Sequence, residues 1–228
     1  MRKSKTSKQT PQIRPLARAF FSRDPRRVAR ELLGKVLVRE FNGGQGRLTA
    51  RIVEVEAYLG VEDPAAHAAA GRTARTSVLF GPPGHAYVYF IYGNHYCLNV
   101  SCEPEGQAGC VLIRALEPIS GIEEMARARA IGIHGPKDLI KLTSGPGRLA
   151  QAFGITIARD NGCDLTSAAN SLWIGKDGYR ARGIRTTLRI GITKAADKPL
   201  RYVLAGNAFV SGPKLASRYL SLYRKRTC

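Results

Sequence analysis

The order of apolar and polar positions predicts many short strands and fewer helices. Apolar residues repeat at helical spacing over residues 28–33, after the helix-start pair Asp24-Pro25 and before Gly34. Alternating or continuous apolar runs predict strands. The expected strands cover residues 35–41, 47–56, 85–92, 95–101, 109–117, 172–174, 187–193 and 201–204. Short turns rich in Gly and Asn separate several of them, which favours antiparallel pairing.

Two further helices are predicted from their start signals. Ser120 and Glu123 have capping-box spacing and predict a helix to about residue 130. The tripeptide 144–146 predicts another helix that ends at Gly154. Residues 57–84 show no clear period, and a loop of that length in a compact domain is usually functional. Because strands outnumber helices, we expect an α+β fold in which flanking helices cover a largely antiparallel sheet.

Composition adds a size and a charge to this picture. The chain has 228 residues, of which 44% are hydrophobic and 23% charged, which fits one large globular domain. Lys and Arg number 36 against 17 Asp and Glu, so the formal net charge is +19. No apolar run approaches the roughly 18–20 residues that span a bilayer, so we expect no membrane partner. A polyanion such as nucleic acid is the favoured partner.

The positive charge is concentrated in two runs. Residues 1–30 hold ten Lys or Arg and one Asp, and residues 176–201 hold eight Lys or Arg and two Asp. Such runs bind a phosphate backbone with release of counterions. We expect residues 1–15 to form a basic, disordered arm, with a transit peptide as the alternative, and residues 16–228 to form the single domain.

Cysteine and histidine usage bears on compartment and metal. The five cysteines are odd in number, and none forms a C-x-x-C pair. Together with the lack of an apolar signal segment, this favours free thiols in a reducing compartment. We therefore expect the bacterial cytoplasm, in association with the nucleoid, or the nucleus or an organelle in a eukaryote. The four histidines have no metal-site spacing, so we expect no structural zinc.

Two carboxylates and an aromatic residue share one face of a predicted strand. With a period of two, Glu54, Glu56 and Tyr58 lie on the face opposite Val53 and Val55. Paired carboxylates beside an aromatic side chain can perform acid–base chemistry. A solvated outer strand face explains the same pattern, and the alternation alone does not separate the two.

A second candidate is a hairpin crowded with aromatic residues. Tyr87 and Tyr89 share a strand face, and Tyr92 and His95 flank the turn at Gly93-Asn94. Such rings can stack on nucleobases, and a side chain at the tip can wedge between base pairs. Cross-strand packing in a core explains them as well. Basic charge, aromatic surfaces and a carboxylate site together suit an enzyme that acts on a flipped nucleotide.

Several long motifs resemble those of the alkyladenine (3-methyladenine) DNA glycosylase family. They occur in order over about residues 16–213, at residues 51–60, 63–67, 81–93, 97–100, 111–118, 142–149 and 198–202. The resemblance implies one domain with a curved antiparallel sheet and a protruding hairpin that inserts into DNA. It implies a hydrolase of base excision repair that needs no metal and no cofactor. Nothing in the sequence implies an oligomer, so we expect a monomer. The substrates would be 3-methyladenine, 7-methylguanine, hypoxanthine and ethenoadenine in double-stranded DNA, cut to leave an abasic site.

The resemblance also implies roles for single residues. Glu56 would be the general base that activates water, and Arg114 would lie near that water and the target phosphate. Tyr58, His67 and Tyr89 would bind the flipped base. The side chain of Asn99 would clash with the 2-amino group of guanine and so exclude it.

The DNA-contacting positions follow from the same resemblance. Tyr92 would be the intercalating wedge, Asn94 would follow it where the family often has an apolar residue, and Arg72 would meet the backbone. The pocket positions contain no lysine to form a Schiff base, so we expect no lyase activity, and a borohydride-trapped adduct would contradict this. The competing interpretations are a non-catalytic RNA- or DNA-binding protein and a glycosidase for free nucleosides, which salt-dependent binding to duplex DNA would separate.

Overall fold

A curled antiparallel sheet forms the centre of the structure. The computed structural model describes residues 12–41, 46–91 and 93–212. Within these ranges the sheet has nine strands in the order β1-β7-β2-β3-β6-β5-β4, with β9 paired to β3 and β8 paired to β9. The strands are β1 (Arg14–Pro15), β2 (Val36–Glu40), β3 (Arg47–Tyr58), β4 (Ala86–Ile91), β5 (His95–Ser101), β6 (Cys110–Ser120), β7 (Leu172–Lys176), β8 (Ile184–Thr187) and β9 (Arg201–Leu204).

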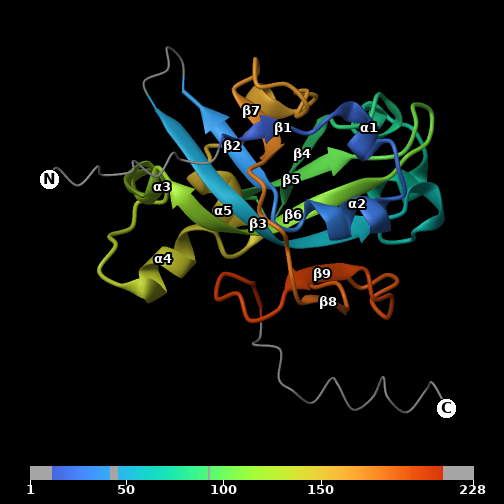
Figure 1. Ribbon diagram of the computed structural model, residues 1–228. Helices are drawn as coiled ribbons and strands as arrows, with labels where there is room; N and C mark the ends of the chain where they lie inside the picture. Colours follow the sequence, from blue (N-terminus) through green and yellow to red (C-terminus); the bar gives the residue numbers. More distant parts are fainter. Residues whose placement is uncertain (1–11, 42–45, 92, 213–228) are drawn as a thin grey trace, which may run out of the picture.

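Short helices flank the sheet, as Figure 1 shows, with α1 and α2 at one end and α3 and α4 at the other. The α-helices are α1 (Arg18–Phe21), α2 (Pro25–Leu32), α3 (Ile122–Ala128), α4 (Pro136–Thr143), α5 (Pro146–Ala152) and α6 (Ile157–Asp160). The segment without a clear period holds three 3-10 turns, η2 (Gly60–Glu62), η3 (His67–Ala70) and η4 (Ser77–Phe80). The predicted α+β fold with an antiparallel sheet is confirmed. In the described part of the chain, no helix is long and apolar enough to cross a membrane.

Helix starts show where local signals succeed. The carboxylate of Asp24 caps α2 by accepting a hydrogen bond from the backbone N–H of Arg26, as predicted. The capping box predicted at Ser120 and Glu123 is wrong. Gly121 precedes α3 in the left-handed region at φ 75°, without a side-chain cap. Ser120 ends β6 instead, and its hydroxyl bonds the Thr49 hydroxyl at 2.7 Å on the neighbouring strand.

The N-terminal and hairpin predictions fall partly outside the described residues. Residues 1–11 of the expected basic arm are not described, whereas Arg14 and Pro15 pair with β7. Strands β4 and β5 pair from Ala86 opposite Val100 to Ile91 opposite His95, as the hairpin predicts. Tyr92, the expected wedge, lies outside the described residues.

Strand β3 organises the site because it pairs with β2, β6 and β9. Val53 and Val55 belong to the buried core that also contains Val28 and Leu32 of α2. Successive side chains on a strand point to opposite faces, so Glu54, Glu56 and Tyr58 face away from α2. On the partner strand, Glu54 pairs with Ala115 and Val55 with Ile113, which leaves Arg114 at a register shift. Such bulges re-aim a side chain, and they are frequent beside active sites.

Candidate active site

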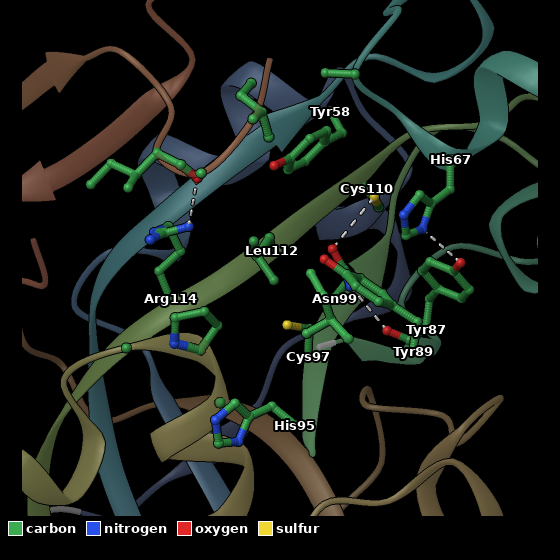
Figure 2. A pocket seen from close by; sticks show the side chains of 18 of the residues that line it. Tyr58, His67, Tyr87, Tyr89, His95, Cys97, Asn99, Cys110, Leu112 and Arg114 are labelled. Carbon is green, nitrogen blue, oxygen red and sulfur yellow. Dashed lines mark hydrogen bonds between the residues drawn. The ribbon is translucent and has the colours of Figure 1, made fainter. Parts of the chain in front are cut away.

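A cavity of about 600 Å³ opens on the face of the sheet that carries Tyr58. Five predicted site residues line it, namely Tyr58, His67, Tyr89, Asn99 and Arg114. They come from β3, η3, β4, β5 and β6, so the fold joins positions far apart in the sequence. In Figure 2 the rings of His67, Tyr87 and Tyr89 gather on one side, and Arg114 lies on the other.

Glu56 lies directly behind the cavity wall and is fully buried. One carboxylate oxygen accepts a hydrogen bond from the Tyr58 hydroxyl at 3.0 Å. The other accepts one from the backbone N–H of Ile190 at 2.8 Å. Arg114 forms an ion pair with it at 3.3 Å. Burial raises the pKa of Glu56, although Arg114 and the Ile190 N–H partly oppose this. The alternative of a solvated outer strand face is therefore wrong for Glu56.

Arg114 links the two carboxylates of β3. Its Nε donates to Glu54 at 2.9 Å, and another guanidinium nitrogen lies 3.3 Å from Glu56 and 3.5 Å from the carbonyl oxygen of Ile190. Burial alone would lower the pKa of Arg114, but the two glutamates raise it above its ordinary value. The guanidinium is thus a fixed positive charge at the cavity surface.

Glu54 holds this arginine rather than facing the cavity. Its fully buried carboxylate accepts hydrogen bonds from Arg114, from Arg201 at 2.7 Å and from the hydroxyl and backbone N–H of Ser211. Neither glutamate is among the described lining residues, but the partners of Glu56, which are Tyr58, Arg114 and Ile190, all line the cavity. The sequence identified the pair of carboxylates by their alternation, but it did not reveal Arg201 or Ser211, which come from the far end of the chain.

The aromatic side of the cavity is tied together by one hydrogen bond. His67 Nδ1 lies 2.9 Å from the Tyr87 hydroxyl, and the His67 ring meets Tyr89 edge-on with centroids 4.5 Å apart. Burial, with a contribution from Arg75, lowers the pKa of His67, so its imidazole is neutral at pH 7. The alternation on β4 marked Tyr87 together with Tyr89 as a candidate stacking ring, but the family resemblance gave Tyr87 no role.

Asn99 lies on the floor of this aromatic side. It is 2% exposed, its Nδ2 donates to the carbonyl of Tyr87 at 3.2 Å, and its Oδ1 accepts from the Cys110 thiol at 3.8 Å. Both bonds hold the amide in one orientation (Figure 2). A rigid polar group at this place can select purines by their edge.

The segment of residues 188–192, which contributes to the cavity wall, does not form the predicted strand. Residues 187–193 were expected to form a strand, but β8 ends at Thr187, and Ile190, Gly191 and Ile192 line the cavity. The alternation of Leu188, Ile190 and Ile192 is typical of a strand. Here the Ile190 N–H bonds Glu56 instead of a neighbouring strand, and Gly191 has φ 76°.

Two predicted DNA-contacting residues lie apart from the cavity. Arg72 is exposed between η3 and η4, and Asn94 is exposed in the turn after β4. Neither lines the cavity. In the residues that the structure describes, no group of three or more His, Cys, Asp or Glu side chains could hold a metal ion.

Comparisons with known proteins add an independent observation. The family model of methylpurine-DNA glycosylases matches residues 19–208. Three relatives carry the name "Putative 3-methyladenine DNA glycosylase". The protein from Koribacter versatilis is 61% identical over 203 residues, covering 89% of this chain and 96% of its own. Those from Rhodopseudomonas palustris and Alkaliphilus oremlandii are 52% and 46% identical, covering 87% and 86% of this chain and 91% and 98% of their own.

Proposed function

The chain belongs to the methylpurine-DNA glycosylase family, and on that basis we propose how it works: as a monofunctional glycosylase that hydrolyses the N-glycosidic bond of damaged purines. The substrates are 3-methyladenine, 7-methylguanine, hypoxanthine and ethenoadenine, flipped from double-stranded DNA. The product is an abasic site. The observation that carries this proposal is Glu56, a buried carboxylate held against Tyr58, Arg114 and Ile190 at the cavity.

In the proposed mechanism Glu56 deprotonates a water that attacks C1′ of the flipped nucleotide. The sugar becomes oxocarbenium-like as the bond to the purine breaks, and a nearby carboxylate also stabilises this charge. The fixed charge of Arg114 keeps the ionised form of Glu56 available. The described lining residues include no lysine for a Schiff base, which supports hydrolysis by water without lyase activity.

The aromatic side of the cavity binds the base in this proposal. Tyr58 and Tyr89 stack on it, and neutral His67 contacts its edge. A cationic alkylated purine gains about 0.5–2 kcal/mol from aromatic faces, whereas a neutral lesion relies on shape and hydrogen bonds. The fixed amide of Asn99 rejects guanine by a clash with its 2-amino group.

The surface outside the cavity contacts the duplex. We assign Tyr92 to the gap left by the flipped nucleotide, Asn94 to the turn beside it and Arg72 to the phosphate backbone. Unstacking costs a few kcal/mol and least for damaged bases, so flipping itself selects lesions. The net charge of +19 favours this polyanionic partner. The protein would work as a monomer on chromosomal DNA, which in bacteria lies in the cytoplasmic nucleoid.

The proposed activity is tested with a duplex carrying one hypoxanthine opposite thymine. The protein is incubated with it in EDTA, and abasic sites are then cleaved with alkali. We expect strand cleavage at the hypoxanthine. If this duplex stays intact, methylated DNA is the second substrate. If neither substrate is cleaved while salt-dependent DNA binding is retained, the enzymatic proposal is contradicted, and a non-catalytic DNA-binding protein remains.

The pH dependence of excision should report Glu56. The base must be ionised, so the single-turnover rate falls as pH drops through its pKa. Because burial raises that pKa, the loss begins at a higher pH than an exposed glutamate would give. Of the groups that face Glu56, the pKa values of Tyr58 and Arg114 are raised, so neither loses its proton at neutral pH. Rates from about pH 5 to about pH 9 on hypoxanthine check this, and a rate that stays flat on the acid side would disagree.

Replacing Asn99 with Ala should weaken discrimination against guanine. The smaller side chain leaves room for a 2-amino group, so excision of guanine from a G·T mispair should rise about tenfold relative to hypoxanthine. Hypoxanthine has no 2-amino group and serves as the internal control. The measurement is the ratio of the two single-turnover rates in wild type and variant. An unchanged ratio would show that Asn99 does not exclude guanine.

A further inference from the structure

A completely buried ion pair lies behind the cavity wall, outside the residues assigned so far. Arg189 and Asp63 have fully buried side chains, and the guanidinium meets both carboxylate oxygens at 2.6 and 2.9 Å. Arg189 also donates to the carbonyl of Ala57 at 3.1 Å and to that of Ala195 at 3.3 Å. Asp63 accepts two further bonds, from the backbone N–H groups of Leu59 and Ala65 at 3.2 Å.

These bonds join three segments that form the cavity. Ala57 is on β3 beside Glu56, and the turns fixed by Asp63 lead to His67 of η3. Arg189 directly precedes Ile190, whose N–H binds Glu56. The ion pair therefore connects the side of the cavity that would bind the base with the side that would activate water.

Arg189 also contacts a base-binding ring directly. Its guanidinium carbon lies 4.7 Å from the centroid of the Tyr58 ring. Tyr58 in turn donates its hydroxyl to Glu56. A ring with a cation fixed on it and its hydroxyl bonded to a carboxylate has little freedom to turn.

We propose that Asp63 and Arg189 are positioning residues, which clamp the segment 188–192 and the Tyr58 ring onto the catalytic carboxylate. The pair touches no reacting atom and acts through Ile190 and Tyr58. This inference rests on the proposed function for its kinetic consequence, but the clamp itself is a property of the fold. Small displacements of groups that orient the reactants can slow catalysis about a hundredfold.

Loss of the clamp should change the pH dependence of the reaction, which general destabilisation of the fold would not do. The Ile190 N–H favours the ionised form of Glu56, so its withdrawal raises the pKa of Glu56 and moves the acid limb of the rate profile to higher pH. The charged or titratable groups around Glu56 are Glu54 and Tyr58 from β3, Cys97 from β5, Arg114 from β6, Arg201 from β9 and Arg189 itself. In Asp63→Asn the unpaired charge of Arg189 favours ionised Glu56 and opposes this shift, whereas Arg189→Lys keeps both charges of the pair. The shift of the acid limb is therefore expected in Arg189→Lys.

The chain offers a matched control. Arg39 and Asp160 form a second buried ion pair at 2.8 Å, with both side chains 1% exposed. The other partners of Arg39 are the carbonyl of Phe153 and the hydroxyl of Ser171, and neither lines the cavity. Asp160→Asn and Asp63→Asn thus remove the same charge from similar surroundings. Both should lower stability, because breaking a buried pair leaves an uncompensated arginine.

The experiment compares wild type, Asp63→Asn, Arg189→Lys and Asp160→Asn in the full-length chain. Single-turnover excision of hypoxanthine, per folded protein, should fall about tenfold or more in Asp63→Asn and Arg189→Lys but not in Asp160→Asn, and the acid limb should move to higher pH in Arg189→Lys. Hydrogen exchange of a peptide covering residues 188–192 should accelerate in the same two variants. Rates and exchange equal to those of Asp160→Asn would overturn the inference.

The experiment also distinguishes failure of the proposed function from failure of the clamp. If wild type excises no base, the proposed function fails, while the exchange of residues 188–192 still confirms or refutes the clamp. If Asp63→Asn does not fold, Arg189→Lys alone carries the test. Lysine keeps the charge beside Asp63 but lacks the planar fork that reaches four acceptors. We expect the same kinetic and exchange changes in Arg189→Lys, and wild-type behaviour there would refute the clamp.

Discussion

Replacing Glu56 with Gln is expected to lower the single-turnover rate of base excision by about 10³-fold or more. Glutamine keeps the volume of the side chain, and its carbonyl oxygen can still accept the Ile190 N–H. It cannot accept the proton of the attacking water, nor can it stabilise the positive charge on the sugar. Both losses act in the transition state, so binding of the lesion duplex should change little.

The measurement uses enzyme in excess over a hypoxanthine duplex, with duplex affinity determined in parallel. Glu117→Gln is the control, because Glu117 is on the same sheet but bonds Asn207 away from the cavity. We expect this control to excise at the wild-type rate. Retention of more than a small fraction of activity by Glu56→Gln would remove Glu56 from its proposed role. Loss of duplex binding instead would indicate a damaged fold.

The alternation of residues 53–58 allowed Glu56 and Tyr58 to be placed together from the sequence. That inference is local, because side chains two apart on one strand share a face whatever the rest of the fold does. Alternation could not show whether the strand face with Glu56 and Tyr58 is exposed to solvent or buried. The answer depends on Arg114, Ile190 and Ser211, which come from β6 and from the end of the chain.

The positions of Arg114 and Asn99 followed from family resemblance rather than from pattern. Arg114 lies at a register shift between β3 and β6, and a pairing irregularity of that kind depends on both strands at once. The segment 188–192 was misjudged for a similar reason. Its apolar alternation is typical of a strand, but the N–H of Ile190 binds the side chain of Glu56, and the side chain of Arg189 is held by Asp63 and by the carbonyl of Ala57. Tertiary contacts of this type override local propensity.

Replacing Glu54 with Gln, unlike replacing Glu56 with Gln, should lower the free energy of unfolding. Glu54 has two buried guanidinium groups on it, from Arg114 and Arg201. In Glu54→Gln both lose their shared negative charge, and the amide N–H₂ faces donors except for the hydroxyl of Ser211. Removing one partner of a buried ion pair costs about 3–5 kcal/mol, so we expect a loss of that size in the free energy of unfolding.

Comparing Glu54→Gln with Glu56→Gln in urea at pH 7 tests this directly. Burial raises the pKa of Glu56 in the folded state, so ionised Glu56 opposes folding above its ordinary pKa, and an uncharged glutamine there should cost little stability. One substitution on β3 should therefore lower stability, and the other, two residues along, should abolish excision while unfolding near the wild-type midpoint. Equal midpoints for Glu54→Gln and wild type would show that the arginines find other partners. A large loss in Glu56→Gln would show that its charge supports the fold as well as the reaction.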